Sequence, residues 1–90
     1  MALDMNSIPA LAPGCRLHAT KDVLLVPEGT LNLNGPSRDI LTRVDGKRSV
    51  RAVVNQLLQE YEGVADAEIR TDVLALLEDL RGRGVLRMKP

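Results

Sequence analysis

Residues 24–41 read LLVPEGTLNLNGPSRDIL, a stretch that contains strand, turn and helix signals in close succession. Its first three residues are apolar and β-prone. Pro27-Glu28-Gly29 then interrupts the run, and Gly29 can adopt the positive φ that many tight turns require. Residues 30–33 alternate polar and apolar side chains, which is typical of a strand with one buried face. Pro36 suits the first turn of the helix that follows.

One more strand is predicted upstream of this stretch. Residues 16–19 alternate in the same way, and residues 20–22 can form a tight turn into the apolar run over residues 23–26. Together with residues 30–33, these segments predict a three-stranded antiparallel β-meander.

The chain has 90 residues, a length that fits one domain. Residues 1–14 contain Pro9, Pro13 and Gly14 and show no apolar period. We therefore expect a flexible N-terminal arm over residues 1–14 and a single domain over residues 15–90.

Three α-helices follow the meander in this prediction. The first spans residues 36–45 and ends at Gly46 as its C-cap. The second begins after Ser49, a good N-cap, and the third begins near Asp66; both have an apolar stripe at helical spacing. Residues 85–88 form a tail that packs as a strand or caps the core. The predicted fold class is α+β and winged-helix-like, with the sheet placed first.

Composition excludes several function classes. Twelve basic and twelve acidic residues cancel, whereas a nucleic-acid binder normally has a basic excess. Tyr61 is the only aromatic residue, so no platform for stacking bases is expected. No stretch approaches the roughly 20 apolar residues of a membrane span. Cys15 is the only cysteine, and residues 1–14 lack the charge and apolar run of a signal peptide, so we expect a cytoplasmic protein.

Neither catalysis nor metal binding is expected. His18 is the only histidine, and strand alternation places it on the opposite face from Cys15. A site made of Cys15, His18 and Asp22 lacks the four Cys or His ligands usual for structural zinc. No glycine-rich loop precedes a helix. We expect no enzyme activity, no metal and no cofactor.

The residues themselves leave two binding modes open. The third helix, over residues 66–83, could imitate the recognition helix of a DNA-binding winged helix, but its acidic excess would be repelled by phosphate. The strand over residues 30–34 could instead accept a peptide strand by β-augmentation. Leu74 lies off the main apolar stripe of the third helix, so it lines a groove beside this strand or simply packs against the sheet.

The sequence resembles the coenzyme PQQ synthesis protein D (PqqD) family, whose members are recognition elements for ribosomally made precursor peptides (RiPP recognition elements). The resemblance covers most of the chain, from Pro13 to Leu86. It rests on the order and spacing of five segments, Arg16-Leu17, LLVPEG at 24–29, LNGPSRDIL at 33–41, Asp45-Gly46 and DVLALLEDL at 72–80. Val26 stands where the family often has an aromatic residue, and Arg43-Val44 where it often has Leu-Cys.

The resemblance implies a non-enzymatic peptide chaperone in pyrroloquinoline quinone (PQQ) biosynthesis. Such a protein binds the precursor peptide PqqA and presents it to the radical-SAM enzyme PqqE. The implied peptide-binding residues lie on the third strand and the third helix: Leu31, Asn32, Leu33, Asn34, Arg70, Val73, Leu74 and Leu77. The two substitutions leave open a recognition domain for a different peptide-modification pathway. Exchange of N-terminal strands between two copies would give a homodimer, and the oligomeric state stays open.

Overall fold

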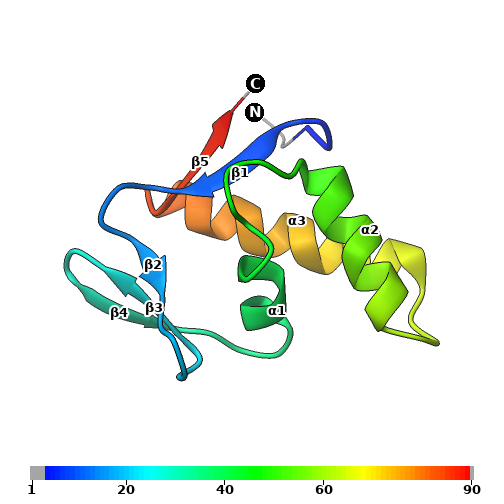
Figure 1. The fold of residues 1–90 in the computed structure, drawn as a ribbon, viewed down its shortest axis with the longest axis horizontal. Coiled ribbons are helices and arrows are strands. Elements are labelled where there is room, and N and C mark those ends of the chain that lie inside the picture. Colours follow the sequence, from blue (N-terminus) through cyan, green and yellow to red (C-terminus); the bar gives the residue numbers. More distant parts are fainter. Residues whose placement is uncertain (1–3, 90) are drawn as a thin grey trace.

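A computed structural model describes residues 4–89 and has the α+β fold class that the sequence predicts. The β-meander lies at one side of the helices (Figure 1). The elements are, in order, β1 (Ile8–Leu11), β2 (Arg16–Leu17), β3 (Val23–Val26), β4 (Gly29–Asn32), α1 (Ser37–Leu41), α2 (Val50–Glu60), α3 (Asp66–Gly82) and β5 (Leu86–Lys89).

The predicted meander is β2-β3-β4, with β3 in the middle. Leu24 of β3 lies opposite Leu31 of β4, and its side chain is completely buried. Gly29 has a φ of 143°, so the glycine after Pro27-Glu28 does take the positive φ that the turn signal indicated. Leu31 is partly buried against the core, whereas Thr30 and Asn32 are exposed, as the alternation predicted.

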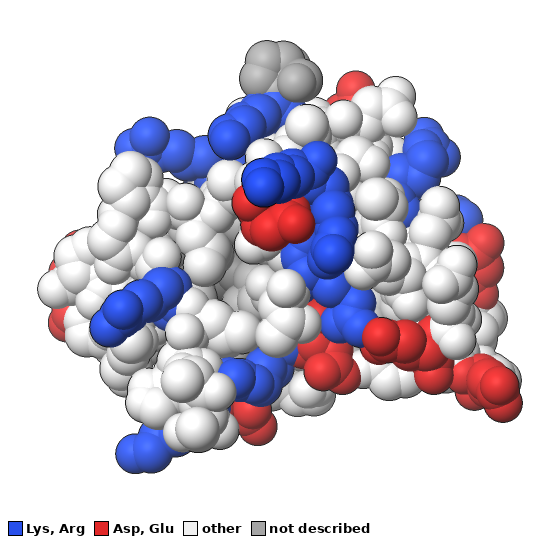
Figure 2. Space-filling view, in the orientation of Figure 1, with Lys and Arg blue, Asp and Glu red and all other residues white. Residues whose placement is uncertain are grey.

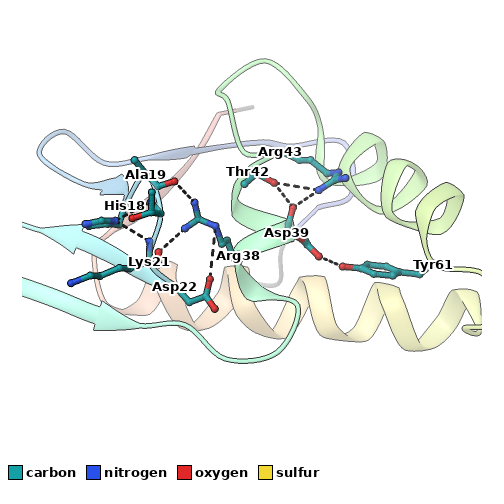
Figure 3. Close-up of polar contacts among 10 residues, drawn as sticks. His18, Ala19, Lys21, Asp22, Arg38, Asp39, Thr42, Arg43 and Tyr61 are labelled. Atoms are coloured by element: carbon teal, nitrogen blue, oxygen red, sulfur yellow. Dashed lines mark hydrogen bonds and ion pairs between the residues drawn. The ribbon is translucent and has the colours of Figure 1, made fainter.

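Arg38 of α1 binds the turn between β2 and β3 (Figure 3). Its guanidinium donates to the carbonyl oxygens of Lys21 at 2.6 Å and Ala19 at 3.0 Å, and lies 3.9 Å from the carboxylate of Asp22. Within the same turn, Nδ1 of His18 accepts the backbone N–H groups of residues 20 and 21, at 3.1 and 3.0 Å. The contacts of Arg38 fix the meander against α1, whereas those of His18 stabilise the turn itself.

The first helix is shorter than the predicted span of residues 36–45, because α1 ends at Leu41. The carbonyl oxygen of Asp39 accepts the side chains of Thr42 and Arg43, and the backbone N–H of Arg43 bonds to Ile40 instead. The chain therefore leaves the helix in tighter turns, and Gly46, at a φ of 77°, lies beyond them.

The predicted start of α2 is confirmed, and that of α3 is correct to within one residue. The Ser49 side chain accepts the N–H of Ala52 at 3.1 Å, as an N-cap does. Asp66 is the first residue of α3 rather than its N-cap, which is Ala65.

The expectation of an arm without regular structure over residues 1–14 is wrong for residues 8–11. These residues form β1, which pairs antiparallel with β5 in a second, two-stranded sheet. Pro9 is among the most completely buried residues. A proline is tolerated in β1 because β1 is an edge strand. The preceding carbonyls of Met5 and Ser7 accept the first N–H groups of α2, both at 2.9 Å. The part of the expectation that concerns residues 1–3 lies outside the described residues.

The core is aliphatic and lies between the helices and the two small sheets. Its most buried members are Leu24, Ile40, Val50, Val53, Leu57, Val73 and Leu77. Within residues 4–89, no helix combines the length and the apolar character that crossing a membrane requires.

Candidate functional site

The outer edge of β4 is unpaired within residues 4–89, because β4 is the last strand of the meander. The N–H of Leu33 donates to the carbonyl of Asp22 at 2.9 Å, which makes these two residues a hydrogen-bonded pair. Antiparallel pairing alternates, so the backbone of Leu31 also faces β3. The N–H and C=O groups of Thr30 and Asn32 therefore face away from the sheet, where another strand could bind them.

A groove of about 350 Å³ runs between this edge and the C-terminal half of α3. Its apolar lining comes from Leu31 and Leu33 on one side and from Leu76 and Leu80 on the other. The polar lining residues are Asn32, Asn34, Ser37, Asp79 and Arg83. The groove thus combines free backbone groups with apolar side chains, the two features that bind an extended peptide.

The groove is electrically balanced. The guanidinium of Arg83 lies 3.1 Å from the carboxylate of Asp79, and both side chains are more than half exposed. A surface ion pair of this kind contributes little to stability. It can be rearranged when a ligand approaches, so it does not block the groove.

The structure brings the four strand residues of the predicted site to the groove but none of the four helix residues. Leu31, Asn32, Leu33 and Asn34 line it. On α3, Val73 and Leu77 are completely buried in the core, and Leu74 is partly buried against the core. Arg70 is exposed and lies 3.4 Å from Asp66 in an ion pair.

The residues that line the groove from this side are Leu76, Asp79 and Leu80 of α3 and Arg83, the C-cap residue directly after it. Their spacing of i, i+3, i+4 and i+7 defines one face of α3. By its helical spacing Leu76 belongs with the apolar stripe of α3, but it is only partly buried and lines the groove. The amphipathic pattern could have indicated this face only if the position of the strand beside it had been known.

The residues considered for catalysis or metal binding have structural surroundings. Nδ1 of His18 is occupied by the two backbone N–H groups of its turn. Cys15 is partly buried and packs against the core. Among the described residues, no three His, Cys, Asp or Glu side chains come together in a way that could hold a metal ion.

Comparison with known proteins identifies a family. Residues 22–86 match the family model for coenzyme PQQ synthesis protein D (PqqD). The chain is 37% identical over 86 residues to a PqqA binding protein of Pseudomonas putida (strain W619), covering 91% of this chain and 92% of the relative. It is 38% identical over 85 residues to the PqqA binding protein of Pseudomonas entomophila (strain L48), covering 90% and 91% of the two chains.

A solved structure has the same fold. It is the solution NMR structure of the PqqD truncation of Methylobacterium extorquens PqqCD, described as a functional, stand-alone RiPP recognition element. The TM-score is 0.80 at 33% sequence identity, and the match covers 96% of this chain and 95% of that one.

Proposed function

The chain belongs to the PqqD family, and we propose that it binds the precursor peptide PqqA as an added strand along the open edge of β4. The observation that carries the proposal is the unpaired edge of β4 beside a partly apolar groove. The names of the relatives support PqqA as the peptide. The peptide's backbone would bind Thr30 and Asn32, and its alternate side chains would enter the groove.

The binding free energy is consistent with contributions from both the backbone of β4 and the apolar side chains of the groove. The outward N–H and C=O groups of Thr30 and Asn32 provide four hydrogen bonds, at about 1 kcal/mol net each. Micromolar affinity needs about 8 kcal/mol, so the backbone alone is insufficient. Two apolar peptide side chains buried beside Leu31, Leu33 and Leu76 would contribute about 1.5–3 kcal/mol each. We therefore expect backbone pairing to set the register and the groove to select the sequence.

The protein's role is presentation rather than chemistry. We propose that the bound peptide is handed to the radical-SAM enzyme PqqE in the cytoplasm, during PQQ biosynthesis. Holding a flexible peptide on a carrier that also binds the enzyme raises the peptide's effective concentration at the active site. The family is one of peptide-recognition proteins, which supports a carrier without catalytic activity of its own.

A pair of substitutions at Asn32 tests the proposal. Asn32→Pro removes an outward N–H that the fold does not use, at an edge position that tolerates proline. Asn32→Ala removes the exposed side chain and keeps the N–H. With PqqA as titrant, we expect Asn32→Pro to weaken binding at least about tenfold and Asn32→Ala to stay within about threefold of the parent protein.

Circular dichroism of both variants is the folding control. Equal affinities of a folded Asn32→Pro variant and the parent protein would exclude strand addition at this edge. Equal losses in both variants would assign the effect to the Asn32 side chain. Sedimentation of the free protein over a concentration range shows whether a second copy already covers β4.

A further inference from the structure

The groove beside β4 and a second hollow lie on the same face of α3. Glu68 and Asp72 border the second hollow, and Leu76, Asp79 and Arg83 border the groove. These five residues recur at i, i+4, i+8, i+11 and i+15, which places them on one stripe of the helix. At 1.5 Å per residue, the stripe is about 22 Å long.

The second hollow, which we call the helix cleft, has a volume of about 210 Å³. Its walls come from the start of α1, the end of α2 and the N-terminal half of α3. The lining residues are Pro36, Ile40, Leu57, Tyr61, Val64, Glu68, Ile69, Asp72 and Val73. Seven of these nine are aliphatic or aromatic, so the cleft is apolar inside with carboxylates at its border.

The loop from β4 to α1 joins the two hollows. Asn34 and Ser37 line the groove, whereas Pro36 between them lines the helix cleft. The N–H of Ser37 donates to the carbonyl of Asn34 at 3.1 Å, which closes this loop into a tight turn. In Figure 1, β4 continues through the loop into α1, and α3 lies behind. A chain that leaves the groove past Asn34 therefore meets the cleft next.

We propose that the helix cleft holds a large apolar side chain of the same bound peptide, contributed by the segment that precedes the part paired with β4. This inference rests on the proposed function, since it extends the peptide site beyond the strand. An antiparallel strand, the more stable arrangement, enters at the Asn34 end of β4. From Leu76 to Asp72 or Ile69 is four to seven helical residues, or about 6–10 Å, which two or three extended peptide residues span.

The volume and the charge of the helix cleft indicate which peptide side chain it can hold and which residues should lie beside that side chain. A cavity of about 150 Å³ is enough to hold benzene, so the helix cleft accommodates an aromatic or long aliphatic side chain. Figure 2 shows basic and acidic side chains interspersed over this face of the molecule, in keeping with the net charge of zero. Glu68 and Asp72 are exposed at the border of the helix cleft, and no basic residue lines it. The peptide segment should therefore carry Lys or Arg beside its apolar anchor.

The cleft is open and partly preformed. Val64 is 40% exposed, more than any other large hydrophobic side chain of residues 4–89. The hydroxyl of Tyr61 donates to the carboxylate of Asp39 on α1 (Figure 3). Arg43, two residues after α1, pairs with Glu60 of α2, so α1 and α2 are connected at the cleft. The hydrogen bond to Asp39 favours the protonated phenol and raises the pKa of Tyr61. A wall that is already fixed loses little entropy on binding.

The test compares Asp72→Lys with a matched control, Glu62→Lys. Both residues are exposed and both substitutions change the net charge equally, but Glu62 lines neither hollow. With full-length PqqA, we expect Asp72→Lys to weaken binding about fivefold or more and Glu62→Lys to change it less than twofold. Equal effects of the two variants, or none, would overturn the inference.

Stepwise amino-terminal truncation of PqqA completes a thermodynamic cycle. One truncation step should lower affinity for the parent protein and for Glu62→Lys, and should have little effect with Asp72→Lys. A loss that appears only on carboxyl-terminal truncation would overturn the direction of binding. If the parent protein does not bind PqqA, the proposed function fails together with this inference. If Asn32→Pro weakens PqqA binding but Asp72→Lys does not, only the inference fails.

Discussion

At the scale of the residue, polar side chains that bind backbone groups shape the connections between elements. Arg38 and His18 act on the turn before β3, whereas Asp45 acts on the turn before α2. The carboxylate of Asp45 accepts the N–H groups of Lys47 at 2.9 Å and Arg48 at 3.0 Å. These bonds position Ser49 to cap α2.

Asp45 makes a pH-dependent contribution to stability. Hydrogen bonds from the N–H groups of Lys47 and Arg48 lower the pKa of Asp45 below its ordinary value of 3.8. The folded state therefore favours the ionised carboxyl, and the stabilisation is present above pH 3.8. It is lost as the pH falls through the lowered pKa.

We expect Asp45→Ala to lower the thermal midpoint of unfolding at pH 7. The difference between the midpoints of the variant and the parent protein should shrink as the pH falls well below 3.8. Thermal unfolding followed by circular dichroism over a pH series measures this difference. Glu28→Ala, which removes an exposed carboxyl from the turn between β3 and β4, is the control. A constant difference across the pH series would contradict a role for the Asp45 carboxylate.

At the scale of the element, β1 and β5 stabilise the fold without forming the candidate site. β1 lies in a different sheet from β4, and its register runs from Ile8 opposite Lys89 to Leu11 opposite Leu86. The N–H of Ala12 extends this contact to the carbonyl of Val85 at 3.0 Å. Removing residues 1–11 would expose the buried side of β5, and it would also remove the carbonyls of Met5 and Ser7 that accept two N–H groups of α2.

Deletion of residues 1–11 should lower the free energy of unfolding by at least about 2 kcal/mol, since it removes the burial of Pro9 and the β1–β5 bonds. Urea denaturation measures this loss, with deletion of residues 1–3 as the length control. Below the unfolding transition, the affinity of the shortened protein for PqqA should stay within about threefold. A large loss of affinity in folded protein would place β1 in the binding site.

The elements that sequence predicted are those with local signals. Pro27-Glu28-Gly29 and the alternation after it identified β3 and β4, and Ser49 identified the start of α2. The tail predicted over residues 85–88 as a strand or a core cap is the strand β5. Its partner β1 lies at the opposite end of the chain, so no local pattern connects the two, and Pro9 made a strand at residues 8–11 hard to recognise. The residues on the helix side of the groove could not be predicted from the sequence either. Leu74 and Leu76 are equally apolar. Only the position of β4 in the fold determines which of the two side chains lines the groove.

At the scale of the whole molecule, the arrangement separates stability from recognition. The described core is built from the helices, β3 and the β1–β5 sheet, whereas β4 contributes backbone groups and the partly buried Leu31 at its border. The helix cleft could not be predicted, because its walls come from three helices whose packing the sequence does not specify. The net charge of zero fits a protein that binds through backbone pairing and apolar contacts rather than through a charged face.

Amide hydrogen exchange of the protein, free and saturated with PqqA, tests the central claim most directly. The amides of Leu31 and Leu33 face β3, so they should be protected in both states. The amides of Thr30 and Asn32 face outward, so they should exchange quickly in the free protein and slow markedly when the peptide binds. Unchanged exchange at Thr30 and Asn32 at saturating peptide would show that PqqA does not add a strand to β4.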